Sequence, residues 1–262
     1  MLGSPWWTAS EASLVARLQA LPFIEFLEAV NQHAKAHSLR SGGHQPLHFV
    51  PQRELPIEQN YEAWIFQTGS VPTRDLAHDR LNAMMWLLYP QTKAALNRLQ
   101  ADEISRRGVQ AARGSARDAA TLWDENLLIL VCFDHTDHLA ALLKAHDWTE
   151  LFLTYRHRWA GVWHPRIFGH ALAEKLMRPY KSISAHCRLL DCASLAPEAI
   201  DNGLATLISD RLGPGDFYPL PVMGLPGWHP ENFQPAFYED RSVFRPPRRR
   251  ISCGWRINSS SA

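Results

Sequence analysis

Apolar residues recur every three or four positions over most of the chain, which predicts a protein built mainly from helices. The predicted helices span residues 10–21, 23–37, 58–66, 73–89, 90–107, 136–146, 149–155, 165–177 and 197–212. Thr73 is the expected N-cap of the fourth of these helices, and Pro90 both ends that helix and begins the next one. Residues 40–56 are rich in glycine and proline and predict a loop that contains a short strand at 47–50.

A different pattern appears near the middle of the chain. Two apolar runs, residues 119–123 and 127–133, flank an Asp-Glu-Asn triplet at 124–126. Apolar runs separated by three turn-forming residues are typical of a β-hairpin. Further strands are predicted at 159–163 and 182–190. Together these elements indicate an α+β fold, helix-dominated, with a small antiparallel sheet built around the hairpin.

The composition changes again toward the C-terminus. Residues 213–247 combine many prolines with aromatic residues such as Trp228 and Phe237. Because disordered linkers are poor in aromatic residues, we interpret this segment as an ordered, extended arm that wraps the core. We therefore expect one globular domain over residues 1–247, followed by a basic, flexible tail over 248–262.

Charge and composition narrow the functional classes. Hydrophobic residues make up 46% of the 262 residues, enough for a sizeable core. Lys and Arg number 27 against 26 Asp and Glu, so the chain lacks the basic excess that is typical of nucleic-acid binding, except in its arginine-rich tail. The sequence shows no signal-peptide pattern, no apolar run of about 20 residues and no CxxC pair among its four cysteines. We therefore expect a cytoplasmic protein with reduced thiols and no membrane contact.

Several catalytic motifs are missing from the sequence. It contains no GxxxxGK[ST] phosphate loop, no GxGxxG, no GxSxG nucleophile elbow and no HExxH. Nucleotide binding through a glycine-rich loop is therefore not expected. The missing elbow argues against the serine chemistry of α/β-hydrolases, and the missing HExxH argues against a zincin-type zinc site.

Four segments of the chain resemble one known family when they are taken together. They read YEAWIFQTGSVPTRDLAHDRLNAMMWLLYPQTKAALN (residues 61–97), RDAATLWDEN (117–126), FGHALAEKLMRPYKSISA (168–185) and FYPLPVMGLPGW (217–228). Their order and character are similar to the proteobacterial family known as domain of unknown function 3025. The resemblance extends over residues 21–247 and implies no particular reaction, cofactor or partner.

Polar residues at helical spacing mark two neighbouring helices. Asp75, His78 and Asn82 are three and four positions apart, so they share one face of the helix predicted over 73–89. Lys93 and Asn97 are four apart on the following helix. Because these helices are otherwise apolar, the polar groups are expected to point into the protein, where a buried imidazole needs hydrogen-bond partners.

A third pair, His170 and Glu174, lies four positions apart on the helix predicted over 165–177. Such a pair can ligate a metal ion or act as an acid–base pair. If His78 and His170 face one cavity, the two imidazoles with Glu174 or Asp75 would form a two-His, one-carboxylate site for a divalent metal. A structural hydrogen-bond network and a metal-free acid–base site are the alternatives.

A fourth group combines Arg117 and Asp118 with Asp124 and Glu125. Paired carboxylates can hold Mg²⁺, but acidic residues are also ordinary at a hairpin turn, and this second interpretation is favoured.

The leading hypothesis is a small hydrolase or lyase that acts on an anionic or phosphate-bearing small molecule. The catalytic candidates are His78, His170, Glu174 and Asp75, and His78, His170 and Glu174 are also the candidate metal ligands. The substrate-binding candidates are Arg74, Asn82, Lys93, Asn97 and Arg117. The alternative hypothesis is a non-catalytic binding protein that contacts a protein or RNA partner through its aromatic arm and basic tail.

Overall fold

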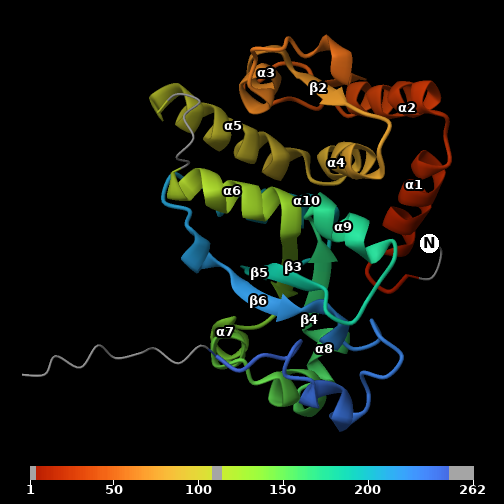
Figure 1. Cartoon of the computed structure of the whole chain (residues 1–262). Coiled ribbons are helices and arrows are strands. Elements are labelled where there is room, and N and C mark those ends of the chain that lie inside the picture. The colour runs from red at the N-terminus through yellow and green to blue at the C-terminus, as the bar shows by residue number, and fades with distance from the viewer. Residues whose placement is uncertain (1–3, 108–113, 248–262) are drawn as a thin grey trace, which may run out of the picture.

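The computed structural model describes residues 4–107 and 114–247 (Figure 1). Its helices are α1 (Ala9–Gln19), α2 (Phe23–Ala36), α3 (Tyr61–Thr68), α4 (Ala77–Leu88), α5 (Pro90–Arg107), α6 (Ser115–Asn126), α7 (Asp137–Ala145), α8 (Arg158–Gly161), α9 (His170–Leu176) and α10 (Pro197–Thr206). Its strands are β1 (His48–Pro51), β2 (Ser70–Thr73), β3 (Leu127–Cys132), β4 (Trp163–Ile167), β5 (Ser184–Asp191) and β6 (Tyr218–Pro221). Helices dominate the chain, which confirms the α+β class.

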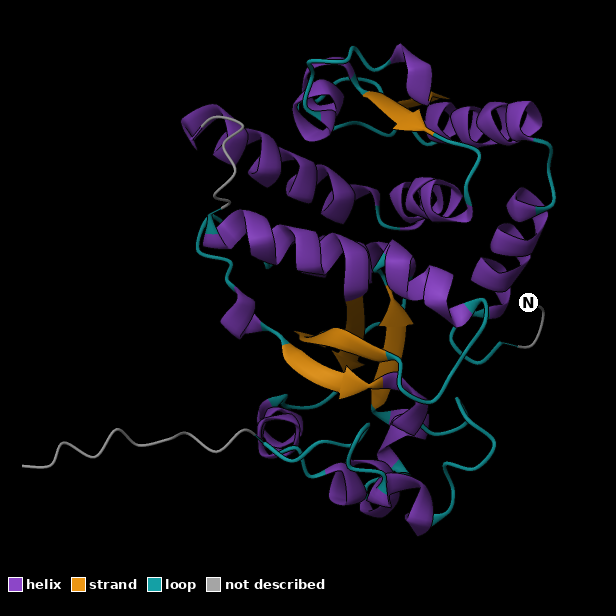
Figure 2. Cartoon of the chain, viewed as in Figure 1, coloured by secondary structure: helices purple, strands orange, loops and turns teal. Residues whose placement is uncertain are grey.

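The larger sheet has the strand order β4-β3-β5-β6 (Figure 2). Strand β3 has the sequence LLILVC and is buried at every position, as expected of a central strand. It pairs antiparallel with β4 and parallel with β5, and β6 pairs antiparallel with β5. The sheet is therefore mixed. A separate two-stranded parallel sheet joins β1 to β2.

The helices lie in layers above one face of the larger sheet (Figure 1). Helices α6, α9 and α10 are nearest the sheet, and α4 and α5 pack on top of them. The unit formed by α2, α3, β1 and β2 lies farther out, while α7 and α8 lie on the opposite side of the sheet. This layering brings α3, α4, α6 and α9 around one polar region.

The predicted β-hairpin over residues 119–133 is wrong. Only its second half is a strand, β3, and the first half belongs to helix α6. The buried residues Ala116, Ala119, Ala120 and Trp123 follow helical spacing. A short apolar run fits a buried helix as well as a strand, so periodicity over five residues does not distinguish them. The acidic residues of this segment therefore lie in the last turn of a helix and not in a hairpin turn.

Several predicted helix starts are displaced, and two of these displacements concern helices of the candidate site. The helix expected at Pro165 begins at His170, because Pro165 lies within β4. Strand β4 is at the edge of its sheet, where a proline without an N–H is tolerated. The helix expected to begin at Thr73 begins at Ala77, because Thr73 ends strand β2. The strand predicted over 159–163 is mostly the short helix α8, and β4 starts at its last residue.

The C-terminal arm, residues 213–247, adds strand β6 and several short 3₁₀ turns. Its buried aromatic side chains are those of Phe217, Trp228, Phe237, Tyr238 and Phe244, and they belong to the same buried cluster as the rest of the core. The buried Asn232 amide ties the arm together by donating to the carbonyls of Met223 and Leu225. The tail expected over 248–262 lies outside the described residues. Among the described helices, none has the length and apolar character that crossing a bilayer requires.

Candidate metal and substrate site

A cavity of about 420 Å³ lies between α3, α4, α6, α9 and the loop that precedes α3. Its lining is rich in polar and charged side chains. The lining residues whose side chains could bind a ligand or take part in a reaction are Tyr61, Glu62, Arg74, His78, Asp79, Asn82, Arg117, Asp124, Glu125 and His170. The cavity therefore collects residues from segments that are far apart in the sequence.

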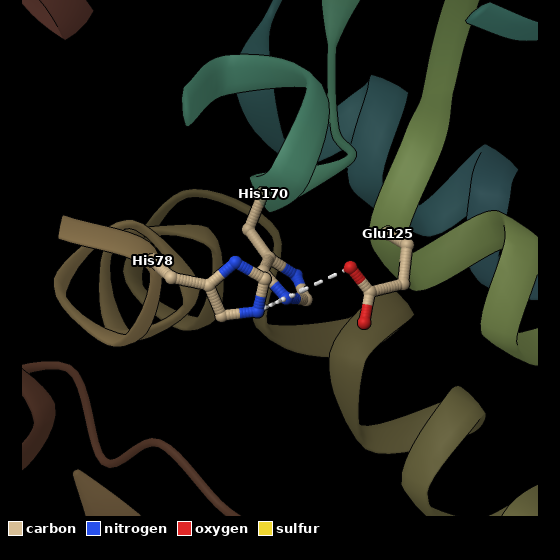
Figure 3. A group of neighbouring side chains, drawn as sticks. All are labelled: His78, Glu125 and His170. Atoms are coloured by element: carbon tan, nitrogen blue, oxygen red, sulfur yellow. Dashed lines mark hydrogen bonds and ion pairs between the residues drawn. The ribbon is translucent and has the colours of Figure 1, made fainter. Parts of the chain in front are cut away.

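The two helix-borne histidines meet in this cavity (Figure 3). His78 lies in the first turn of α4, and His170 is the first residue of α9. Their Nε2 atoms are 3.0 Å apart, and their rings are inclined at 76°. The packing of α4 against α9 produces this contact.

Gly169 allows α9 to begin against the end of α6. A Cβ at this position would lie 2.5 Å from the backbone nitrogen of Leu127 and 2.6 Å from that of Asn126. The Gly169 N–H also donates to the Leu127 carbonyl. Because backbone atoms cannot move aside as a side chain can, glycine is needed here to bring His170 next to the last turn of α6.

Glu125 supplies a carboxylate to the same point. Its Oε2 atom lies 3.6 Å from Nε2 of His170. One ligand atom each from His78, Glu125 and His170 lies within 4.8 Å of the other two. Tetrahedral ligands about 2.0–2.2 Å from a metal ion lie roughly 3.3–3.6 Å from one another. The separations of 3.0 Å between the imidazoles and 3.6 Å between His170 and Glu125 are close to this range, so these three side chains could hold a divalent ion. The sequence interpretation chose Glu174 as the carboxylate, whereas the structure groups Glu125 with the imidazoles.

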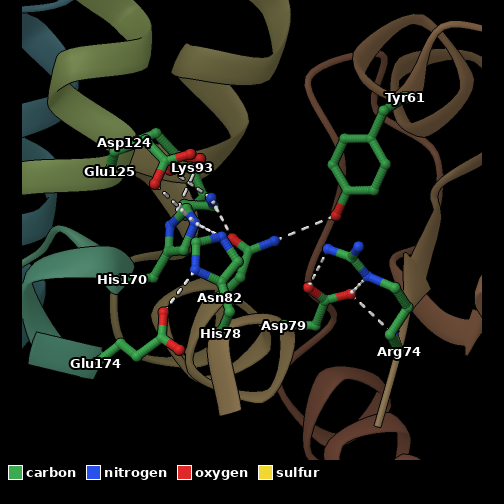
Figure 4. Close-up of polar contacts among 10 residues, drawn as sticks. All are labelled: Tyr61, Arg74, His78, Asp79, Asn82, Lys93, Asp124, Glu125, His170 and Glu174. Carbon is green, nitrogen blue, oxygen red and sulfur yellow. Dashed lines mark hydrogen bonds and ion pairs between the residues drawn. The ribbon is translucent and has the colours of Figure 1, made fainter. Parts of the chain in front are cut away.

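Each histidine has a second carboxylate behind its other nitrogen (Figure 4). Oε2 of Glu174 lies 2.9 Å from Nδ1 of His78. Oδ2 of Asp124 lies 3.8 Å from Nδ1 of His170, which is longer than a hydrogen bond but close enough for electrostatic attraction. An ionised carboxylate accepts hydrogen bonds only, so it favours the tautomer with hydrogen on Nδ1 and a free lone pair on Nε2.

Burial sets the protonation of this group. It lowers the pKa of His170 to about 4, an effect that Asp124 opposes and Lys93 reinforces. His170 is therefore neutral at pH 7. Burial alone would raise the pKa of Asp124, but Lys93 and His170 hold it below its usual value. Burial and the nearby Asp124 charge raise the pKa of Glu125.

A chain of hydrogen bonds runs behind the cavity wall (Figure 4). The buried Lys93 ammonium donates to Oδ1 of Asp124 over 2.5 Å and to Oδ1 of Asn82 over 2.7 Å. The Asn82 amide then donates to the Tyr61 hydroxyl over 3.1 Å. Lys93 thus compensates the charge of the mostly buried Asp124 and fixes Asn82, which in turn positions Tyr61 in the lining.

Asn97 has a comparable position deeper in the protein. Its Nδ2 donates to Oε2 of Glu62 over 2.8 Å and to the Glu62 carbonyl over 2.9 Å. Its Oδ1 accepts from the Gly42 N–H over 3.1 Å. Neither Lys93 nor Asn97 belongs to the lining residues, so the structure places both behind the surface that a substrate would contact.

The remaining charged candidates divide between the cavity and its surroundings. Arg74 lines the cavity and makes a two-pronged ion pair with Asp79. Asp75 pairs with Arg80 and is not among the lining residues. Since α4 begins only at Ala77, Asp75 does not share the helical face of His78.

Arg117 lines the cavity from the first turn of α6. Its guanidinium makes no ion pair with another residue that the structure describes.

Sequence reasoning did not identify Tyr61 and Glu62 as part of the site. Both come from the start of α3, and their contacts reach Asn82 on α4 and Asn97 on α5. No local spacing connects these helices. The Asn60 side chain that caps α3 marks where the helix begins, but it does not indicate which way Tyr61 and Glu62 face.

Comparison with the curated proteins and with solved structures gives no match. The family model described as "Protein of unknown function (DUF3025)" matches residues 47–248. This range includes every residue that lines the cavity and covers more than half of the chain. The chain therefore belongs to the DUF3025 family.

Proposed function

We propose that this protein is a hydrolase that uses a divalent transition-metal ion, held by His78, Glu125 and His170, to act on a small anionic molecule. The observation that carries the proposal is the convergence of two imidazole nitrogens and one carboxylate oxygen on one point of an open polar cavity.

Facing lone pairs favour a cation at this point. The two Nε2 atoms are 3.0 Å apart, and the carboxylates behind both rings favour lone pairs on these atoms. A single proton could join two of the three acceptor atoms, whereas a metal ion binds all three. Two histidines and a carboxylate are a ligand set found for zinc and for non-haem iron and related metals. Such an ion supplies a Lewis acid and lowers the pKa of a bound water.

Electrostatics link the metal to an anionic substrate. Among the charged lining residues, Asp79 is paired with Arg74 and Asp124 with the Lys93 behind it. The carboxyl groups of Glu62 and Glu125 then outnumber the one remaining arginine, Arg117. Without a metal, this excess of acidic groups disfavours an anion, and a divalent cation offsets it. Arg117 is then available to bind the substrate's negative group.

Tyr61 offers a second contact for the substrate. Burial raises the pKa of Tyr61 well above its usual value, so its phenol stays neutral. Its oxygen accepts from Asn82, which leaves the O–H to donate to a molecule in the cavity.

The first experiment measures metal content. Untagged protein should contain close to one equivalent of a transition metal, and Co²⁺ added to stripped protein should give a saturable visible absorption band. His78→Gln and His170→Gln should abolish this binding, whereas His135→Gln, which changes an exposed histidine, should leave it intact. Equal Co²⁺ binding in all four proteins, or none in the wild type, would remove the metal from the proposal.

The second experiment measures the reaction. Model phosphomonoesters, phosphodiesters and carboxylate esters are incubated with the metal-loaded protein. We expect hydrolysis of at least one class that is lost with a chelator and in Glu125→Gln. Arg117→Gln should raise KM more than it lowers kcat, because Arg117 is proposed to bind the substrate and not the metal. A metal-loaded protein inactive on all three classes would contradict the hydrolase assignment but not the metal site.

The binding-protein alternative receives less support from the described residues. Most aromatic side chains of the arm are buried in the core, and Phe233 is the large aromatic residue of the arm that is clearly exposed, at 63%. The arm's aromatic side chains are therefore mostly used in packing. The basic tail lies outside the described residues.

A further inference from the structure

A second hollow, of about 350 Å³, lies between residues 37–44 and the first half of α5. Its basic lining residues are His37, Arg40, His44 and Arg98, and none of the lining residues is acidic. This composition is the reverse of that of the candidate metal site, where carboxylates outnumber arginines. The two cavities share no lining residue.

His44 brings the two arginines together. Nη1 of Arg40 donates to the His44 carbonyl over 2.9 Å, and Nη2 of Arg98 donates to Nε2 of the His44 ring over 2.6 Å. The two guanidinium groups are thus hydrogen-bonded to the same residue, one to the carbonyl of His44 and the other to its ring. Each guanidinium has five N–H donors, so most donors of both arginines remain available.

The loop that carries His44 is held in a fixed shape. His44 adopts a φ of 63°, a left-handed conformation that is uncommon for a residue other than glycine. A Cβ at Gly42 would lie 2.5 Å from the backbone nitrogen of Arg98, and one at Gly43 would lie 1.9 Å from the Phe66 carbonyl oxygen. The loop therefore lies directly on the backbone of α5 and α3, which preorganises the positions of the basic groups.

The arginines of this hollow are not neutralised by ion pairs within the described residues. Neither Arg40 nor Arg98 forms an ion pair with a residue in the described part of the chain. The first amides of α5 are not available to a ligand, because the buried Asp201 accepts from the N–H groups of Gln91 and Thr92. An anion in the hollow would consequently be held by the basic side chains.

We propose that this hollow is a binding site for a phosphate group, held between the guanidinium groups of Arg40 and Arg98, with His44 fixing their positions. Guanidinium groups match the oxygen geometry of phosphate and make charge-assisted hydrogen bonds with it. An oxyanion between the arginines also relieves their mutual repulsion. The phosphate is either free or part of a small molecule, and the site is independent of the proposed metal chemistry.

The test is a titration of metal-stripped protein with inorganic phosphate at constant ionic strength, followed by calorimetry and by backbone amide NMR. Arg40→Gln and Arg98→Gln should each weaken binding about tenfold or more, since each removes charge-assisted hydrogen bonds. Arg98→Lys should retain part of the affinity. Arg211→Gln, which removes an exposed arginine elsewhere, should bind as the wild type does. Thermal unfolding of each variant verifies that it is folded.

The amide signals locate the bound phosphate. Shifts at Gly43 and His44 would support the site, and stronger binding of glycerol phosphate than of inorganic phosphate would identify a phosphate-bearing molecule as its ligand, while equal binding would identify free phosphate. The proposal is overturned if the wild type shows no saturable binding at millimolar phosphate. It is also overturned if Arg117→Gln abolishes binding while Arg40→Gln and Arg98→Gln do not, because the phosphate would then occupy the candidate metal site.

Discussion

The Nε2 atoms of His78 and His170 face each other at 3.0 Å although 92 positions separate the two residues in the chain. Helix packing alone would bring the two rings together, but it would not make both imidazoles face each other through Nε2. Glu174 contacts Nδ1 of His78, and Asp124 lies beyond Nδ1 of His170, so the two rings meet through Nε2. Nε2 of His170 also lies 3.6 Å from Oε2 of Glu125. The relationship between the histidines thus depends on carboxylates from two further positions.

Glu125 and Glu174 should differ in their effect on metal binding. We expect Glu125→Gln to abolish most Co²⁺ affinity, because it replaces a charged ligand with a neutral amide. Glu174→Gln should weaken binding by about 10–100-fold, the usual effect of losing a carboxylate that orients a metal-binding histidine. Glu198→Gln, at an exposed position, is the control. A larger loss in Glu174→Gln than in Glu125→Gln would favour the ligand set expected from the sequence.

Gly169 should resist substitution by alanine. The added Cβ would meet backbone atoms of Asn126 and Leu127 at 2.5–2.6 Å, so α9 must shift away from α6. We expect a loss of about 1–3 kcal/mol in the free energy of unfolding, as is typical of overpacking, together with weaker Co²⁺ binding. Gly161→Ala is the matched control, because its Cβ would have no atom within 4 Å. Equal stability of the two variants in urea would contradict the role assigned to Gly169.

The sequence predicted the residues that helices bring to the candidate site, but it did not predict that Glu125 joins them. His78, His170 and Glu174 lie on helices with clear apolar periodicity, and the structure brings these side chains into contact. The long periodic runs that became α4 and α5 were also recognisable, with starts displaced by a few residues at most. Local spacing is sufficient for such elements because their helical period repeats over several turns.

The position of Glu125 could not be derived in the same way. Its segment contains a short, mostly apolar run over residues 119–123 that fits a strand or a helix, and the hairpin interpretation placed Glu125 in a turn. Only the packing of α9 against the end of α6, made possible by Gly169, shows that this carboxylate faces His170. A contact of this kind is a property of the tertiary structure, and no spacing along one element encodes it.

Stability should depend on pH through His170. Its pKa falls from 6.5 in the unfolded chain to about 4 in the folded protein, so the unfolded state takes up a proton first as the pH decreases. The stability of the metal-free protein should therefore decrease between pH 6.5 and 4, by about 3 kcal/mol at most from this residue. His170→Gln should show a smaller decrease over the same range. Chemical denaturation at several pH values, with a chelator present, measures both slopes, and equal slopes would contradict a buried neutral His170.

Lys93 should be important for folding because it is the ion-pair partner of Asp124, whose side chain is only 14% exposed. The Lys93 side chain is only 5% exposed, and its ammonium also donates to Asn82. Lys93→Met should cost up to about 3–5 kcal/mol, since it leaves a mostly buried carboxylate without its counter-charge. The double variant Lys93→Met, Asp124→Asn removes both charges and should recover a substantial part of this loss. Equilibrium unfolding of the wild type, both single variants and the double variant gives the coupling energy between the two residues. A double variant no more stable than Lys93→Met would show that the Lys93 contribution comes from packing against Trp86, whose ring lies 5.3 Å from the ammonium, and not from compensation of Asp124.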